Sequence, residues 1–178
     1  MLAVLEELGR RFGHPGRIYL AGSSALIWEG LRTESVDIDY AAEVDDVWEA
    51  ELSRVIREVK DRMQVNLELA SPGDFIPLPP GWRDRSPWLG RYGALDVHGF
   101  DPYATALTKL LRGRASDIED VSGLLRQGTI EHAQLARWAD WLVDQVRLNG
   151  WHAAGDREEV RAKLDASLAR CEELLAQG

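Results

Sequence analysis

Two aspartates alternate with apolar residues in the segment Val36-Asp37-Ile38-Asp39-Tyr40. Side chains in a β-strand alternate between the two faces, so a strand here would place Asp37 and Asp39 on one face. Two neighbouring carboxylates raise each other's pKa unless a positive charge lies between them. Mg²⁺ can supply that charge, because it commonly takes one or two carboxylates and keeps positions for substrate phosphates. The pattern therefore indicates either a divalent-cation site or the solvated face of an edge strand.

A Gly22-Ser23-Ser24 turn follows a short apolar run upstream of the two aspartates. Glycine lets the backbone approach a ligand closely, and a helix that begins at Ser23 or Ser24 would direct its free N–H groups toward an anion. The turn therefore favours a phosphate site one strand away from the cation site.

Together the two motifs resemble the signature of the polymerase-β-like nucleotidyltransferase superfamily, a Gly-Ser turn followed by a strand with two alternating acids. The stretch is similar to the bacterial branch of AbiEii-type abortive-infection toxins and related uncharacterised nucleotidyltransferases, whose pattern is roughly G-x-A-L, then G, then R-x-T-x-D-I-D. The matching residues are Gly22 to Leu26, Gly30, Arg32 and Ser35 to Asp39. The chain departs from the branch at Ser35, the usual threonine place, and at Ala21, where many members have a second glycine.

The resemblance implies a cation site and a nucleotide site. Asp37 and Asp39 would be catalytic and would bind Mg²⁺ or Mn²⁺. The superfamily often adds a third metal-binding carboxylate on a later strand, for which Glu68 is the candidate and Asp96 the rival. The implied nucleotide-binding residues are Gly22, Ser23, Ser24, Arg32, Lys109 and Asp117.

Lys109 belongs to a later motif of the same branch, similar to K-L…R-D-x-x-D. Here Arg114 and Asp117 are separated by two residues, which departs from the family pattern. Its charge makes Lys109 a reasonable phosphate ligand and catalytic residue. The alternative is a salt bridge from Lys109 to Asp117 or Asp120.

Apolar periodicity and cap signals predict the elements that would position these residues. The predicted helices cover about 2–12, 25–31, 45–60, a segment starting at Pro102, a segment starting at Ser116, 131–148 and 156–175. The predicted strands cover 17–21, 36–40, 63–70 and 92–97. In the third strand, Val65, Leu67 and Leu69 share one face, and Gln64, Asn66 and Glu68 share the other.

These elements predict an α+β protein with a nucleotidyltransferase fold. A small mixed β-sheet flanked by helices would occupy residues 1–100, and a helical C-terminal part, residues 101–178, would pack on it with the metal site in the cleft between them. Residues 71–90 hold five of the seven prolines and should form a long surface loop. Its tryptophans and arginines would either contact a nucleotide or pack down as a stiffened flap.

Composition narrows the function classes. The net charge of −9 argues against non-specific wrapping of nucleic acid, although a local basic patch could hold an RNA end. Cys171 is the only cysteine, which excludes an internal disulfide and fits a reducing cytoplasm. No apolar run approaches the roughly 20 residues that cross a bilayer, so we expect a cytoplasmic protein without a membrane partner.

The resemblance implies a metal-dependent nucleotidyltransferase that moves a nucleoside monophosphate from a nucleoside triphosphate to an acceptor. That acceptor would be the 3′ end of a tRNA or a protein hydroxyl, and the chain would act in phage defence or beside a cognate antitoxin. The alternative is a catalytically inactive binding or antitoxin-like module with the same fold. The position of the third carboxylate is the feature that separates the two.

Overall fold

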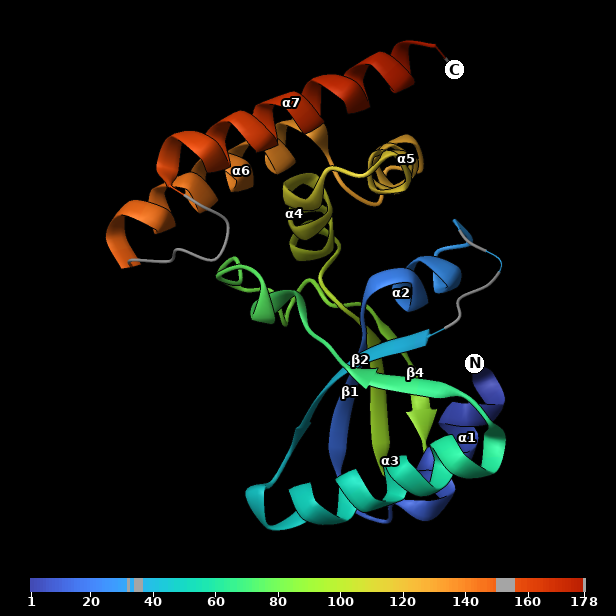
Figure 1. The fold of residues 1–178 in the computed structure, drawn as a ribbon. Coiled ribbons are helices and arrows are strands. Elements are labelled where there is room, and N and C mark those ends of the chain that lie inside the picture. Colours follow the sequence, from blue (N-terminus) through green and yellow to red (C-terminus); the bar gives the residue numbers. More distant parts are fainter. Residues whose placement is uncertain (32, 34–36, 150–155, 178) are drawn as a thin grey trace. The chain divides into compact units, whose positions relative to one another are not determined.

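The computed structural model describes residues 1–31, 33, 37–149 and 156–177 of the chain. These residues form two compact units, which we describe separately (Figure 1). One unit comprises Met1–Ser71 with Ser86–Phe100, and the other comprises Pro72–Arg85 with Asp101–Gly178.

The first unit is built on a five-stranded mixed sheet in the order β3-β2-β1-β5-β4. The strands are β1 (Gly16–Leu20), β2 (Asp37–Val44), β3 (Asn66–Leu69), β4 (Trp88–Tyr92) and β5 (Leu95–Gly99). β1 pairs in parallel with β5 and antiparallel with β2, while β2 and β3 are parallel and β4 and β5 antiparallel. The expected α+β class, a small mixed sheet flanked by helices, is confirmed.

Helices α1 (Leu2–Arg11) and α3 (Glu49–Met63) cover one face of this sheet (Figure 1). Their apolar stripes meet the strand residues that point toward the same face, and the buried strand residues of this core are Ile18, Leu20, Tyr40, Leu67, Leu95 and Val97. The alternating acids of β2 therefore lie on the opposite face. Period-two alternation thus separates the core from the candidate site.

Two short helices connect these elements. Helix α2 (Gly22–Trp28) follows β1 and contacts β2. A 3₁₀ turn, η1 (Asp46–Trp48), precedes α3, and Asp45 caps it by accepting a hydrogen bond from the Val47 N–H at 3.2 Å. The helix predicted over about 45–60 thus begins with a 3₁₀ turn. Helix α2 begins three residues earlier than expected.

The hairpin of β4 and β5 corrects the predicted end of the long loop. The loop was expected to run to residue 90, but Trp88, Leu89 and Gly90 belong to β4. A two-residue turn starting at Gly93 joins the strands, and Gly93 has a φ of +60°. A Cβ on Gly93 would lie 2.1 Å from the Gly9 carbonyl oxygen, so α1 lies against this turn through two glycines.

Two leucines at apolar positions of the predicted elements are exposed. Leu2 is 55% exposed and Leu69 is 72% exposed. Leu2 is the first residue of α1, and Leu69 ends the edge strand β3, which is shorter than the predicted strand. Residues at the ends of elements lack neighbours on one side, so the periodic pattern overestimates their burial.

The second unit is helical, as expected for the C-terminal part. It contains η2 (Pro72–Asp74), α4 (Pro102–Arg112), α5 (Ala115–Arg126), α6 (His132–Asn149) and α7 (Arg157–Ala176). Cys171 is buried on α7, and burial raises the pKa of its thiol. Within the described ranges, no helix is long and apolar enough to cross a bilayer.

Segment 72–85 groups with these helices partly through Arg85. Its Nη2 lies 2.6 Å from Oδ2 of the fully buried Asp101, and its Nη1 donates to the Pro80 carbonyl at 2.8 Å. Asp101 is also the cap of α4, since it accepts from the Tyr103 N–H at 3.0 Å. The start predicted at Asp101-Pro102 is confirmed.

Helix α5 begins one residue before the start predicted at Ser116. The helix begins at Ala115, and the backbone N–H of Arg114 donates to Asp117 Oδ2 at 3.2 Å. Asp117 therefore supplies a polar acceptor at this helix start.

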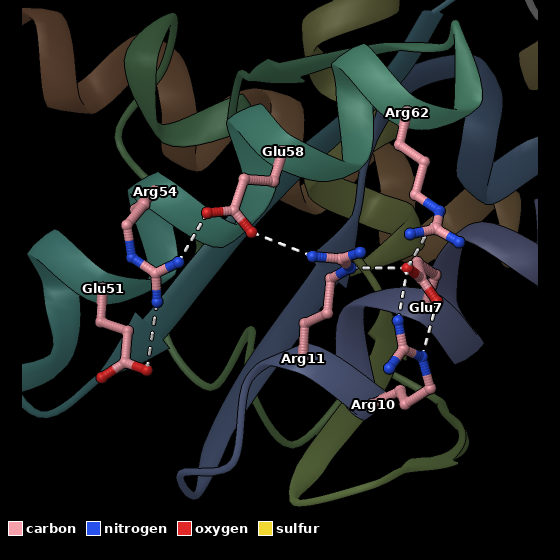
Figure 2. A network of polar contacts seen from close by, with 7 residues as sticks. All are labelled: Glu7, Arg10, Arg11, Glu51, Arg54, Glu58 and Arg62. Atoms are coloured by element: carbon pink, nitrogen blue, oxygen red, sulfur yellow. Dashed lines mark hydrogen bonds and ion pairs between the residues drawn. The ribbon is translucent and has the colours of Figure 1, made fainter.

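A ladder of arginines and glutamates joins α1 to α3 (Figure 2). Glu7 accepts hydrogen bonds from Arg10 at 2.8 Å and from Arg11 at 2.5 Å. Arg11 also contacts Glu58 at 3.0 Å, and Arg54 contacts Glu58 at 2.6 Å. The hydrogen bonds from Arg10 and Arg11 lower the pKa of Glu7 to about 2.

Removal of the Glu7 charge should change the acid stability of the protein. Because the pKa of Glu7 is lowered on folding, its contribution is complete above its unfolded pKa of about 4.5 and is lost as the pH falls toward 2. We expect the melting temperature of the wild type to fall more steeply than that of Glu7→Gln across this range. Glu6→Gln, at an exposed neighbouring position, is the control and should follow the wild type. Identical pH profiles for the wild type and Glu7→Gln would contradict the assignment.

Candidate functional site

The candidate site lies on the face of the sheet opposite α1 and α3, where β2 and β3 run side by side. Their parallel register pairs Asp37 with Asn66 and Asp39 with Glu68. Paired residues on neighbouring strands share a face. The structure thus brings two carboxylates of β2 next to a carboxylate and a carboxamide of β3.

The Asn66 side chain lies between two of these acids. Its Nδ2 donates to Asp37 Oδ1 at 2.6 Å and to Glu68 Oε1 at 2.7 Å. Both are hydrogen bonds to ionised acceptors, which are shorter and stronger than neutral ones. One amide nitrogen therefore links a carboxylate of β2 to a carboxylate of β3.

Gly22 lies directly against the second aspartate. It has a φ of +54°, and a Cβ at this position would lie 2.2 Å from Asp39 Oδ2. Any other residue would force the carboxylate or the turn to move. The Gly-Ser turn and the acidic pair are thus in direct contact rather than a strand apart.

Two hydrogen bonds also join the turn to β2. The Ala21 N–H donates to the Asp39 carbonyl at 2.9 Å, and the buried Ser24 hydroxyl donates to the Asp37 carbonyl at 3.3 Å. The Ser24 hydroxyl therefore positions the start of β2, while Ser23 is half-buried. Arg32 lies outside the described residues.

Asp96, the rival third carboxylate, is placed elsewhere on the sheet. It pairs with Arg17 on β1, whereas the Asp39 carbonyl accepts from the N–H of Ala21, which follows the end of β1 and lies four residues after Arg17. At about 3.3 Å per residue, this separates Asp96 from Asp39 by about 13 Å along the strand. Asp96 also forms two 2.8 Å hydrogen bonds with Arg91, which lower its pKa to about 2. Glu68 is therefore the acid near Asp37, and its role as a metal ligand stays a prediction.

The donors at this site are the hard oxygens that Mg²⁺ and Mn²⁺ prefer. No group of three or more His, Cys, Asp or Glu side chains within the described part of the chain converges closely enough to hold a metal ion. A cation here would thus need oxygen ligands beyond the carboxylates, from Asn66 or from nucleotide phosphates. With those ligands the residues fit a magnesium site.

Lys109 forms a buried charge cluster within the helical unit. Its Nζ lies 2.8 Å from Asp120 Oδ2 and 3.6 Å from Asp117 Oδ1, and the lysine is 4% exposed. The salt bridge considered as the alternative is therefore present. To bind a phosphate, Lys109 would have to leave two carboxylates in a buried environment.

Asp117 completes this cluster. It is fully buried, accepts a hydrogen bond from Arg112 Nε at 2.8 Å and a second bond from Arg112 Nη2, and accepts from the Arg114 N–H. Burial raises the pKa of Asp117, but Arg112 and Lys109 outweigh it and hold the pKa below its usual value. Lys109 and Arg112 thus pair with Asp117 and Asp120 within the helical unit. A nucleotide-binding role for Asp117 stays a prediction.

Asn66 is the residue whose role was not recognised from the sequence. The period-two pattern already placed it on the same face as Glu68. Its contact with Asp37 depends on the pairing of β2 with β3, which local spacing does not specify.

Residues 3–140 match the model of a family described as nucleotidyltransferase of unknown function (DUF6036). No curated protein and no solved structure matches the chain. The matched residues include the Gly-Ser turn, both aspartates of β2, Glu68 and the Lys109 cluster. The match spans most of the 178 residues, and the chain therefore belongs to this nucleotidyltransferase family.

Proposed function

We propose that the chain is a metal-dependent nucleotidyltransferase that moves a nucleoside monophosphate from a nucleoside triphosphate to an acceptor hydroxyl. The observation that carries the proposal is the contact between Gly22 and the Asp39 carboxylate, on the face that also holds Asp37 and Glu68. Only glycine allows this approach. A phosphate seated on the turn would therefore adjoin the acidic pair.

Asp37 and Asp39 would hold Mg²⁺ or Mn²⁺, with Glu68 as the third carboxylate. The bound cation supplies positive charge that orients the phosphates and stabilises the leaving pyrophosphate. Gly22 and Ser23 would bind the triphosphate through the backbone N–H groups of the turn. Arg32 would add a positive charge. Ser24 would belong to the same nucleotide-binding turn, and its hydroxyl holds the Asp37 backbone.

The proposed acceptor is the 3′ end of a tRNA or a protein hydroxyl, because the resemblance to AbiEii-type toxins points to such substrates. The same resemblance implies a role in a toxin–antitoxin pair or in phage defence, with a cognate antitoxin as partner.

One observation favours a second candidate, a catalytically inactive binding or antitoxin-like module. Within the described residues, the acids of β2 and β3 do not form a three-carboxylate metal group, and an amide nitrogen links two of them. A module of this kind would bind a nucleotide or a partner without releasing pyrophosphate.

A transfer assay separates the two candidates. The purified chain is incubated with each α-labelled nucleoside triphosphate in turn, with Mg²⁺ or Mn²⁺ and with total tRNA. We expect the wild type to label RNA or protein and the Asp37→Asn/Asp39→Asn double variant to lose at least about 100-fold in rate, because the variant lacks both carboxylate charges. A folded wild type that transfers no label with any nucleotide would favour the binding module.

Gly22→Ala tests the contact between the turn and Asp39, with Gly30→Ala as a matched control. Both glycines have positive φ, at +54° and +73°, but a Cβ at Gly30 has no atom within 4 Å. The two variants therefore share the backbone strain, and only Gly22→Ala displaces the Asp39 carboxylate. We expect Gly22→Ala to lower the transfer rate at least about 10-fold more than Gly30→Ala. Equal rates in two folded variants would show that the contact is not needed for transfer.

Lys109→Met tests whether this lysine acts in the cluster or on phosphates. The variant leaves two buried carboxylates short of a cation and should lose about 3 kcal/mol of unfolding free energy in urea. The double variant Lys109→Met/Asp120→Leu removes the pair and should recover most of that loss. If Lys109 acts only in the cluster, the double variant transfers within a few-fold of the wild type. A stable double variant without transfer would instead support the phosphate-binding role expected from the resemblance.

A further inference from the structure

We propose that Asn66 is a cation ligand at this site and that its amide reverses when the cation binds. In one orientation its nitrogen holds Asp37 and Glu68 together. In the other orientation its oxygen binds the cation together with Asp37 and Glu68. The inference rests on the proposed function, because it adds a residue to the cation site assigned there.

The amide nitrogen of Asn66 lies between the two carboxylates. Nδ2 donates to Asp37 at 2.6 Å and to Glu68 at 2.7 Å, so both oxygens lie within hydrogen-bonding distance of one atom. The amide lies where a positive charge would best offset the two carboxylates. An N–H group carries only a partial positive charge, so a cation beside the same two oxygens would interact with them more strongly than the amide nitrogen does.

Backbone pairing holds all three side chains in this arrangement. Asn66 is the register partner of Asp37, and Glu68 follows two residues later on the same face of β3. Placement on strands keeps such groups more precisely than placement on loops. A cation held by Asp37 and Glu68 would thus necessarily lie beside the Asn66 amide.

Electrostatics decides which end of the Asn66 amide faces the two carboxylates. The carboxamide must present its NH₂ group to the two carboxylates, because its oxygen would be repelled by both. A divalent cation between the carboxylates inverts this preference, since it repels the N–H groups and attracts the oxygen. Rotation about the last side-chain torsion exchanges the two amide ends, and that torsion is broad and roughly two-fold. Amide oxygens are ordinary ligands of hard cations.

Asn66 could instead act only as a spacer that the cation displaces. The two roles make opposite predictions for Asn66→Ala. Loss of a ligand weakens cation binding, whereas loss of a competing donor leaves it unchanged or strengthens it. Asn66→Asp keeps an oxygen and adds a charge, so it preserves cation binding if an oxygen at this position is a ligand.

The first experiment measures Mn²⁺ binding to the full chain by electron paramagnetic resonance. The proteins are the wild type, Asn66→Ala, Asn66→Asp, Asp37→Asn/Asp39→Asn as the negative control and Asp96→Asn as a control acid on the same sheet. We expect Asn66→Ala to bind Mn²⁺ about 10-fold more weakly than the wild type or worse, and Asn66→Asp and Asp96→Asn to bind at least as tightly. Thermal melting without metal checks that each variant is folded.

Three outcomes would overturn the inference. Wild-type affinity or tighter binding in Asn66→Ala would identify the amide as a spacer, and weak binding in both Asn66 variants would show that an oxygen there is not a ligand. In either case, the proposed function would stand if the wild type bound Mn²⁺ and the Asp37→Asn/Asp39→Asn variant did not. If the wild type bound no Mn²⁺, the metal-dependent function would fail together with the inference.

A second measurement does not depend on the affinity of the variants. In a ¹⁵N-labelled wild type, the Asn66 side-chain NH₂ signals are assigned by their absence from the Asn66→Asp spectrum. We expect saturating Mg²⁺ to shift these signals, because the bonds to Asp37 and Glu68 are lost when the amide reverses. Signals that stay in place while Mg²⁺ saturates the site would overturn the proposal.

Discussion

The repulsion between carboxylates on neighbouring strands is the constraint on which the candidate site depends. Asp37 and Asp39 share a face of β2, and parallel pairing adds Glu68 beside them. The Asn66 amide offsets part of this repulsion through two short hydrogen bonds. On the other face, Ile18, Leu20 and Leu67 pack beneath α1 and α3. The strands therefore combine a buried apolar face, which stabilises the unit, with an acidic face that favours a cation.

In the helical unit, the buried acids are paired with positively charged side chains. Lys109 and Arg112 balance Asp117 and Asp120 within the same two helices, so the cluster is neutral while mostly removed from water. A buried charge without a partner is costly, which favours complete internal pairing. On the acidic face of β2 and β3, an amide nitrogen without a full charge links two carboxylates. This difference explains why the proposed cation chemistry is assigned to the sheet.

Much of the fold followed from local patterns. The alternation of acids with apolar residues predicted the strand around Asp37, and Asp45 and Asp101 marked the starts of η1 and α4. Local patterns were less accurate at the ends of elements, as Leu2 and Leu69 show. They also failed to identify β4, because the prolines before Trp88 obscured a strand that is stabilised by pairing with β5.

The sequence by itself determined which residues share a face and which family the motifs resemble, because both depend on short-range order along the chain. Only the tertiary structure decided between Glu68 and Asp96 as the neighbour of Asp37, because strand order and register depend on contacts between segments distant in sequence. For the same reason, the contact of Gly22 with Asp39 and the bridge made by Asn66 emerge only when the strands pair. Lys109 shows the same limit: its charge suggested a phosphate ligand, and the packing of α4 with α5 gave it two buried carboxylates.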